Sequence, residues 1–217
     1  MGKVIDPSVR EELAGKRIWD TDMSEEQIKI AERIESAFIN SFEQDIESGI
    51  VPWADANNII EYMDYMAQEG LGSEDLIEYL AKRSGIGPDA FKQTWAKLTD
   101  EQKIDVLNSI AHKIAYRGLE ELLKTIVDDL NRQRKYRKDR GWILVTALDY
   151  AFKVQKVGYD WLENVITNVL WPAKKKKKDR KAYEDFVRGL DLAYYLNEEE
   201  LEDLIVEYLV FGLAEKC

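Results

Sequence analysis

Residues 24–48 read SEEQIKIAERIESAFINSFEQDIES, and this stretch decides the fold class. Its first four residues form a capping-box pattern, in which Ser24 and Gln27 satisfy free backbone amides at the start of a helix. The apolar residues that follow recur every three or four positions, the spacing of one helical face: Ile28, Ala31, Ile34, Phe38, Phe42 and Ile46. The pattern predicts a helix that ends near Ser48, because Gly49 and Pro52 follow.

The same signals recur along most of the chain. We expect further helices over about 55–68, over 74–83 and from Pro88, a residue suited to a first helical turn. A second capping box, Thr99-Asp100-Glu101-Gln102, opens a helix that Gly118 is expected to break, so that a separate helix continues to about 130.

The C-terminal half shows the same helical periodicity. Residues 142–156 are apolar nearly all round, which is typical of a buried central helix, and Asp160 is suited to cap a helix over 161–171. Asn197 with Glu200 predicts the start of the last helix. Because no alternating strand pattern of useful length is present, the sequence predicts an all-α protein, a multi-helix bundle of roughly nine to ten helices without significant β-sheet.

Charge divides the chain into parts. Residues 132–181 hold 15 basic and 5 acidic side chains, whereas both flanking segments are strongly acidic and the whole chain carries a net charge of −11. We therefore expect an acidic helical part over 1–131 and a second helical part over 132–217, which contains the basic segment and acidic C-terminal helices. The two parts are also compatible with one continuous domain.

The basic residues of 132–181 form two blocks beside aromatic side chains. Like charges placed together repel, so such blocks usually persist because an anionic partner meets them. Lysine binds phosphate as a point charge without reading base sequence, and a neighbouring tryptophan can stack on bases. The predicted nucleic-acid-binding residues are Arg132, Arg134, Lys135, Arg137, Lys138, Arg140, Trp142, Trp171, Lys174, Lys175, Lys176, Lys177, Lys178, Arg180 and Lys181.

The position of Gly158 decides whether the two blocks act together. If Gly158 is the turn of an antiparallel helix pair, both blocks lie at one end of that pair; if 142–171 is one straight helix, a block lies at each end. A residue suited to cap a new helix, Asp160, comes two positions after Gly158 and favours the antiparallel pair.

The leading functional prediction is a non-enzymatic nucleic-acid-binding protein, structural or packaging in character. The alternative is an assembly or structural protein, for example of virion type, in which the basic segment of one subunit contacts an acidic surface of another and builds a homo-oligomer. A third interpretation treats the basic blocks as solvated loops and helix ends without a partner.

A separate stretch, residues 80–95, resembles the helix-turn-helix of bacterial and archaeal regulators. Ala81 and Gly85 stand at the expected spacing, and Pro88 begins the helix that would read DNA. The resemblance implies that Lys92 and Gln93 face bases. It departs from the pattern at Thr94, which occupies a late apolar position, and it covers only the 16 residues 80–95. A helix-turn-helix transcription regulator is the second alternative.

The residue inventory gives little support for an enzyme. His112 is the single histidine and Cys217 the single cysteine, so a paired-histidine di-iron site and a zinc or thiol site lack ligands. We predict no catalytic residue, no metal and no cofactor, although clustered carboxylates leave room for magnesium chemistry. With no secretory signal and no apolar run long enough to span a bilayer, we expect a cytoplasmic protein that engages no membrane, and its Glu- and Lys-rich composition is thermophile-like.

Overall fold

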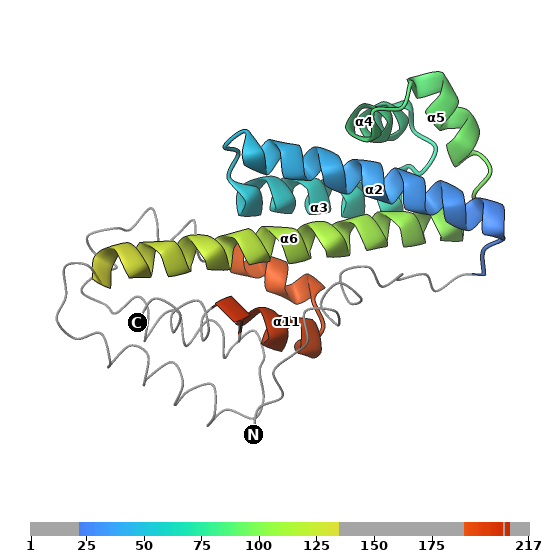
Figure 1. The fold of residues 1–217 in the computed structure, drawn as a ribbon. Coiled ribbons are helices and arrows are strands. Elements are labelled where there is room, and N and C mark those ends of the chain that lie inside the picture. Colours follow the sequence, from blue (N-terminus) through green and yellow to red (C-terminus); the bar gives the residue numbers. More distant parts are fainter. Residues whose placement is uncertain (1–21, 135–188, 206, 209–217) are drawn as a thin grey trace. The chain divides into compact units, whose positions relative to one another are not determined.

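The computed structural model describes residues 22–134, 189–205 and 207–208, and every regular element in these residues is helical (Figure 1). The elements are α2 (Glu25–Glu47), α3 (Pro52–Glu69), α4 (Glu74–Ser84), α5 (Pro88–Trp95), α6 (Asp100–Arg134), the short 3-10 helix η2 (Leu190–Tyr195) and α11 (Glu198–Ile205). The predicted all-α class is therefore confirmed. The described residues contain six α-helices rather than the nine to ten expected of the whole chain.

The predicted caps set the helix starts. Ser24 and Gln27 exchange side-chain and backbone hydrogen bonds at the start of α2. Thr99 with Gln102 does the same at α6, and Asn197 with Glu200 at α11. Helix α3 begins three residues earlier than predicted because Pro52 occupies its first turn, where the missing proline amide would have no helical partner.

The predicted break at Gly118 is wrong. Helix α6 runs without interruption over 35 residues, and Gly118 is buried within it. A single glycine costs a helix only about 1 kcal/mol relative to alanine. Burial of the neighbouring Leu119, Leu122 and Leu123 stabilises the helix on both sides of that position by more than this.

The chain divides into two compact units, and the division falls inside α6. One unit is Asp6–Ile114; the other contains Met1–Ile5 and Ala115–Cys217. This division follows contacts within the fold, whereas the expected boundary at residue 131 follows charge and stays a prediction.

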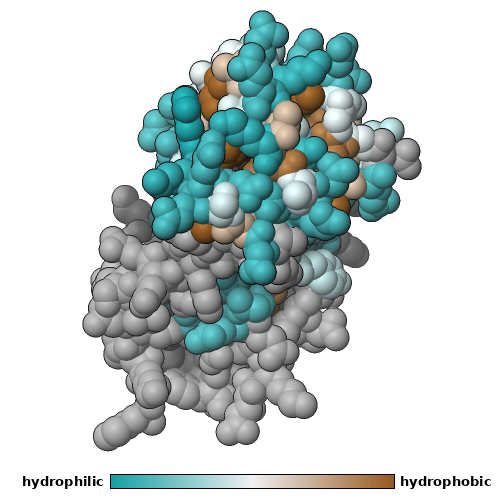
Figure 2. All heavy atoms as spheres, turned by 90° about the vertical axis from the view of Figure 1, so that its right-hand side faces the viewer, coloured by the Kyte–Doolittle hydropathy of each residue, from teal (hydrophilic) through white to brown (hydrophobic). Residues whose placement is uncertain are grey.

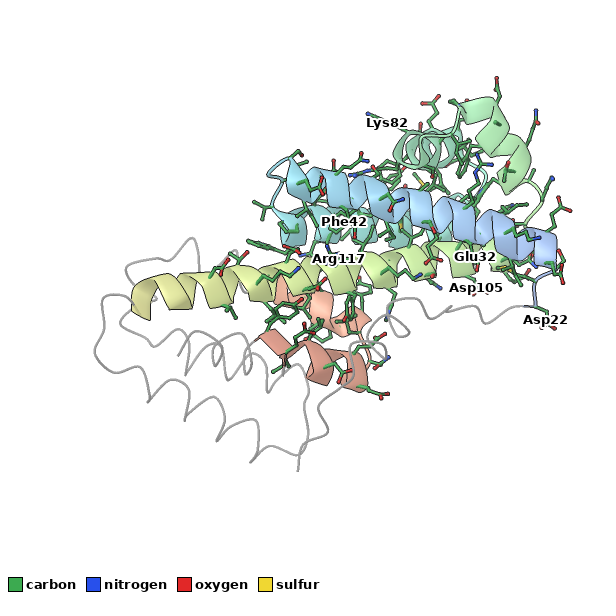
Figure 3. All side chains as sticks on the ribbon, in the orientation of Figure 1. Asp22, Glu32, Phe42, Lys82, Asp105 and Arg117 are labelled. Atoms are coloured by element: carbon green, nitrogen blue, oxygen red, sulfur yellow. The ribbon has the colours of Figure 1, made fainter. Side chains whose placement is uncertain are left out.

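Within the unit Asp6–Ile114, α2 and α3 run side by side, and α2 also lies along the first half of α6 (Figure 1). The Gln102 side-chain amide donates hydrogen bonds to the backbone oxygen of Asp22 and to the side chain of Gln27. Figure 3 labels Asp22 just before the start of α2. The core contains apolar side chains of α2 to α6, and Ile34, Phe38 and Phe42 among them belong to the face that periodicity predicted for 24–48. These core side chains are at most 2% exposed: Ile34, Phe38, Phe42, Ile59, Leu76, Leu80, Phe91 and Ile110.

Candidate functional site

Most of the predicted nucleic-acid-binding residues lie outside the described part of the chain. Arg132 and Arg134 belong to the last turn of α6, so the first basic block begins on a helix. Residues from 135 to 188 are not described, and they include the remaining predicted residues: Lys135, Arg137, Lys138, Arg140, Trp142, Trp171, Lys174, Lys175, Lys176, Lys177, Lys178, Arg180 and Lys181. The arrangement of 142–171 around Gly158 lies in the same stretch.

Many cations of the described residues are already paired with carboxylates of the same unit. Lys97 lies 2.7 Å from Glu26, and Lys103 lies 2.8 Å from Asp100. Two more pairs involve a carboxylate with little exposure, namely Lys113 with Glu35 and Arg117 with Glu120. In a third, Arg83 pairs with Asp45 of another helix. These cations compensate the acidic helices and are poorly placed to supply a large positive surface.

Arg83 joins three helices of the unit Asp6–Ile114. From α4 its guanidinium contacts Asp45 on α2 and lies 3.5 Å from Asp55 Oδ2 on α3. The same group lies over the ring of Phe38, 5.8 Å from its centroid, which is within the range of a cation–π contact. Arg83 thus fixes α4 against α2 and α3.

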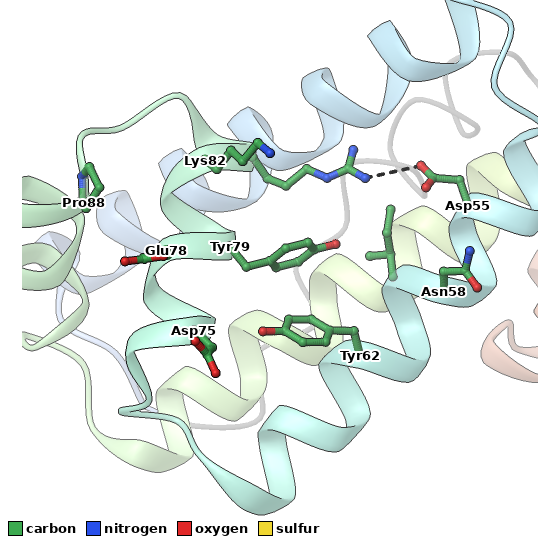
Figure 4. A pocket seen from close by; sticks show the side chains of 10 residues that line it. Asp55, Asn58, Tyr62, Asp75, Glu78, Tyr79, Lys82 and Pro88 are labelled. Atoms are coloured by element: carbon green, nitrogen blue, oxygen red, sulfur yellow. Dashed lines mark ion pairs between the residues drawn. The ribbon is translucent and has the colours of Figure 1, made fainter.

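Beside Arg83, an open groove of about 740 Å³ lies between α3 and α4 (Figure 4). Tyr62 and Tyr79 form one wall, with ring centroids 4.6 Å apart in an edge-to-face arrangement. Asp75 lies beside Tyr62, and Glu78 lies on the side toward Pro88 (Figure 4). We call this the α3–α4 groove, and its lining is Asp55, Asn58, Ile59, Tyr62, Asp75, Glu78, Tyr79, Lys82, Arg83 and Pro88.

The groove has a negative character that its own cations do not remove. Burial raises the pKa of Asp55, the neighbouring Arg83 lowers it, and the net pKa is above the usual range. Asp55 Oδ2 is buried and accepts no hydrogen bond within the described residues. Burial also raises the pKa of Tyr62, and the charge of Asp75 raises it further. Asp75 and Glu78 are exposed and form no ion pair with any described residue.

The stretch that resembles a helix-turn-helix does form two helices joined by a tight turn. Gly85 ends α4 in the left-handed conformation with φ of 61°, and α5 begins at Pro88. Phe91 is fully buried, and Trp95, the residue after Thr94, is 2% exposed. Lys92 and Gln93 are exposed, and Lys92 lies 4.0 Å from Glu74 on α4.

The unit that contains Ala115–Cys217 holds a buried carboxylate network. Glu120 is 3% exposed, accepts a 2.5 Å hydrogen bond from the Tyr208 hydroxyl and pairs with Arg117. Lys124 lies 3.6 Å from Glu120 and also faces the Tyr208 ring. Every charged member has an opposite charge beside it, so the buried charges of this cluster are compensated inside the unit.

Across 22–134, 189–205 and 207–208, no three His, Cys, Asp or Glu side chains are grouped as metal ligands, and no helix is both long enough and apolar enough to cross a bilayer. His112, the single histidine of the chain, is half-buried on α6. No protein-family model matches the chain, and neither a curated protein nor a solved structure is detectably similar to it.

Sequence reasoning missed the α3–α4 groove. Its residues come from α3, α4 and, at Pro88, α5, and along these helices most of them are ordinary members of a polar face. A partial signal is the spacing of Asp75, Glu78, Tyr79 and Lys82, which places them on one side of α4. Only the tertiary structure shows that this side of α4 faces α3.

Proposed function

We propose that the protein is a non-enzymatic nucleic-acid-binding protein, structural or packaging in character, whose residues 132–181 hold the phosphate backbone. The observation that carries the proposal is charge segregation: 15 basic against 5 acidic residues in this segment, within a chain of net charge −11. Phosphate contacts by Lys and Arg dominate non-specific affinity for nucleic acids.

The ion pairs formed by the described Lys and Arg residues support this proposal. In the part of the chain that the structure describes, Lys97, Lys103, Lys113, Arg83 and Arg117 each face a carboxylate of their own unit. A polyanion that approached those helices would meet neutralised or acidic surface. Figure 2 shows one face of the molecule, on which hydrophilic side chains predominate among the described residues and apolar ones are scattered.

The test is a filter-binding titration of duplex and single-stranded DNA at several salt concentrations. If about six phosphates are contacted, affinity should fall by roughly three decades between 50 and 200 mM salt. The variant K174Q/K175Q/K176Q/K177Q should bind at least tenfold more weakly than the unmodified chain. The matched control K29Q/K82Q/K92Q/K97Q removes four exposed lysines from the other unit and should bind within about twofold of it.

Two results would overturn the proposal: no binding at 50 mM salt, or an affinity that does not change with salt. An equal loss of DNA affinity in both variants would show that binding depends only on the net charge of the chain. A selective loss in the control set, which includes Lys92, would instead favour the helix-turn-helix regulator, whose supporting observation is the α4–Gly85–α5 geometry. Exposed Glu74, Asp75, Glu78 and Asp89 around that helix pair would repel phosphate.

A second candidate function is self-assembly through contacts between the basic segment and an acidic surface of another subunit. The specific observation in its favour is the α3–α4 groove, where exposed carboxylates lie beside two tyrosine rings.

A further inference from the structure

We propose that the α3–α4 groove is a docking site for a lysine-rich segment, and that its occupant is the run Lys174–Lys178 of a second copy of this chain. The inference goes beyond nucleic-acid binding and does not depend on it, because the groove lies wholly within the unit Asp6–Ile114.

The first step is the groove's charge. Four carboxylates lie in or against it, namely Asp45, Asp55, Asp75 and Glu78, whereas its cations are Lys82 and Arg83. Arg83 is committed to Asp45 and Asp55, so its charge is compensated inside the fold. Asp75 and Glu78 remain exposed, and neither forms an ion pair with a described residue.

The second step is the aromatic wall. Tyr62 and Tyr79 are both half-buried, so each ring is held by packing while part of it borders the groove. A tyrosine ring attracts an ammonium group placed over its face, and lysine stems pack well on apolar surface. Carboxylates beside tyrosine rings are therefore complementary to lysine side chains, and they would repel phosphate, free carboxylates or nucleic acid.

The third step is the choice of occupant. Residues 174–178 are five consecutive lysines, and the first acid near them is Asp179. An extended chain sends successive side chains to opposite sides, so alternate lysines of such a run can face one groove while the others stay in water. The occupant and the groove are parts of the same sequence, which makes the contact heterologous and able to extend into rings or filaments.

The direct test uses a fluorescently labelled peptide of residues 173–181, AKKKKKDRK, titrated into the full-length chain and followed by anisotropy. We expect saturable binding that D75N/E78Q weakens about tenfold or more. The control E47Q/E101Q removes the same charge from exposed positions away from the groove and should stay within about twofold of the unmodified chain. Lys82→Gln, which removes a repelling cation from the lining, should strengthen binding.

An equal loss of peptide affinity in D75N/E78Q and E47Q/E101Q would overturn the groove as the binding site. Non-specific electrostatic attraction to the acidic chain would then explain the binding. The absence of binding at 50 mM salt would also overturn it. Circular dichroism of each variant establishes that its helices are intact. Tyr62→Leu keeps all charges but removes one ring of the aromatic wall, and it should lower the affinity for the peptide.

The second-copy occupant is tested by sedimentation velocity of the nuclease-treated full-length chain. We expect self-association that weakens with salt, is reduced by D75N/E78Q and is unchanged by E47Q/E101Q. A chain that binds the peptide but stays monomeric at high concentration would show that the groove takes a basic segment of another protein, which overturns this occupant. DNA binding by D75N/E78Q should be undiminished, so failure here and failure of nucleic-acid binding are distinguishable.

Discussion

Glu120 shows how a single buried carboxylate responds to competing effects. Burial raises its pKa, but the hydrogen bond from Tyr208 and the charges of Arg117 and Lys124 together lower it below the usual value of 4.5. Because the folded-state pKa is the lower one, the carboxylate contributes stability above about pH 4.5, and that contribution is lost as the pH falls through the folded-state pKa.

We therefore expect Glu120→Gln to lower the free energy of unfolding at pH 7 by about 1–3 kcal/mol, since it leaves Arg117 and Lys124 without their buried partner. The difference from the unmodified chain should shrink as the pH falls below 4.5. Urea denaturation, followed by circular dichroism at several pH values, measures this difference in the free energy of unfolding. Glu47→Gln, at an exposed position, should show no such trend, and a difference that grows toward low pH would contradict the assignment.

At the scale of elements, the turn between α4 and α5 depends on one backbone conformation. Gly85 has φ of 61°, where a side chain is strained although no atom would clash with an added Cβ. This turn orients α5 and brings Pro88 to the edge of the α3–α4 groove. The geometry of the helix pair is therefore set by glycine's conformational freedom.

Gly85→Ala should destabilise the chain by about 1 kcal/mol through backbone strain alone. Gly72→Ala is the matched control, because Gly72 also has open space around it but lacks a positive φ, and its effect should stay within about 0.5 kcal/mol. Thermal and urea unfolding of both variants provide the comparison. Equal losses of stability in the two variants would contradict backbone strain at Gly85 as the cause of the destabilisation.

At the scale of the whole molecule, charge is the organising feature. The described helices carry acidic surface whose cations are largely paired, whereas residues 132–181 concentrate the basic side chains. If the lysine run serves both the α3–α4 groove and nucleic acid, the two ligands compete for it, because the same ammonium groups cannot face both.

A short DNA duplex added to the nuclease-treated chain should therefore reduce its self-association, in proportion to the fraction of chain bound to DNA. Sedimentation velocity with labelled duplex follows both species at low salt. Assemblies that persist at saturating duplex would show that separate residues contact DNA and protein. Uncharged dextran of similar mass is the control for crowding, and it should leave the assemblies unchanged.

The sequence by itself determined the helical class, the caps at Ser24, Thr99 and Asn197, and the buried face of α2, because capping and periodicity are local properties of consecutive residues. It also determined the charge segregation on which the proposed function rests. The continuity of α6 through Gly118 and the α3–α4 groove were decided only by tertiary structure. Burial of neighbouring leucines outweighs a local glycine preference, and a groove between helices depends on how their faces pack, which no single helix encodes.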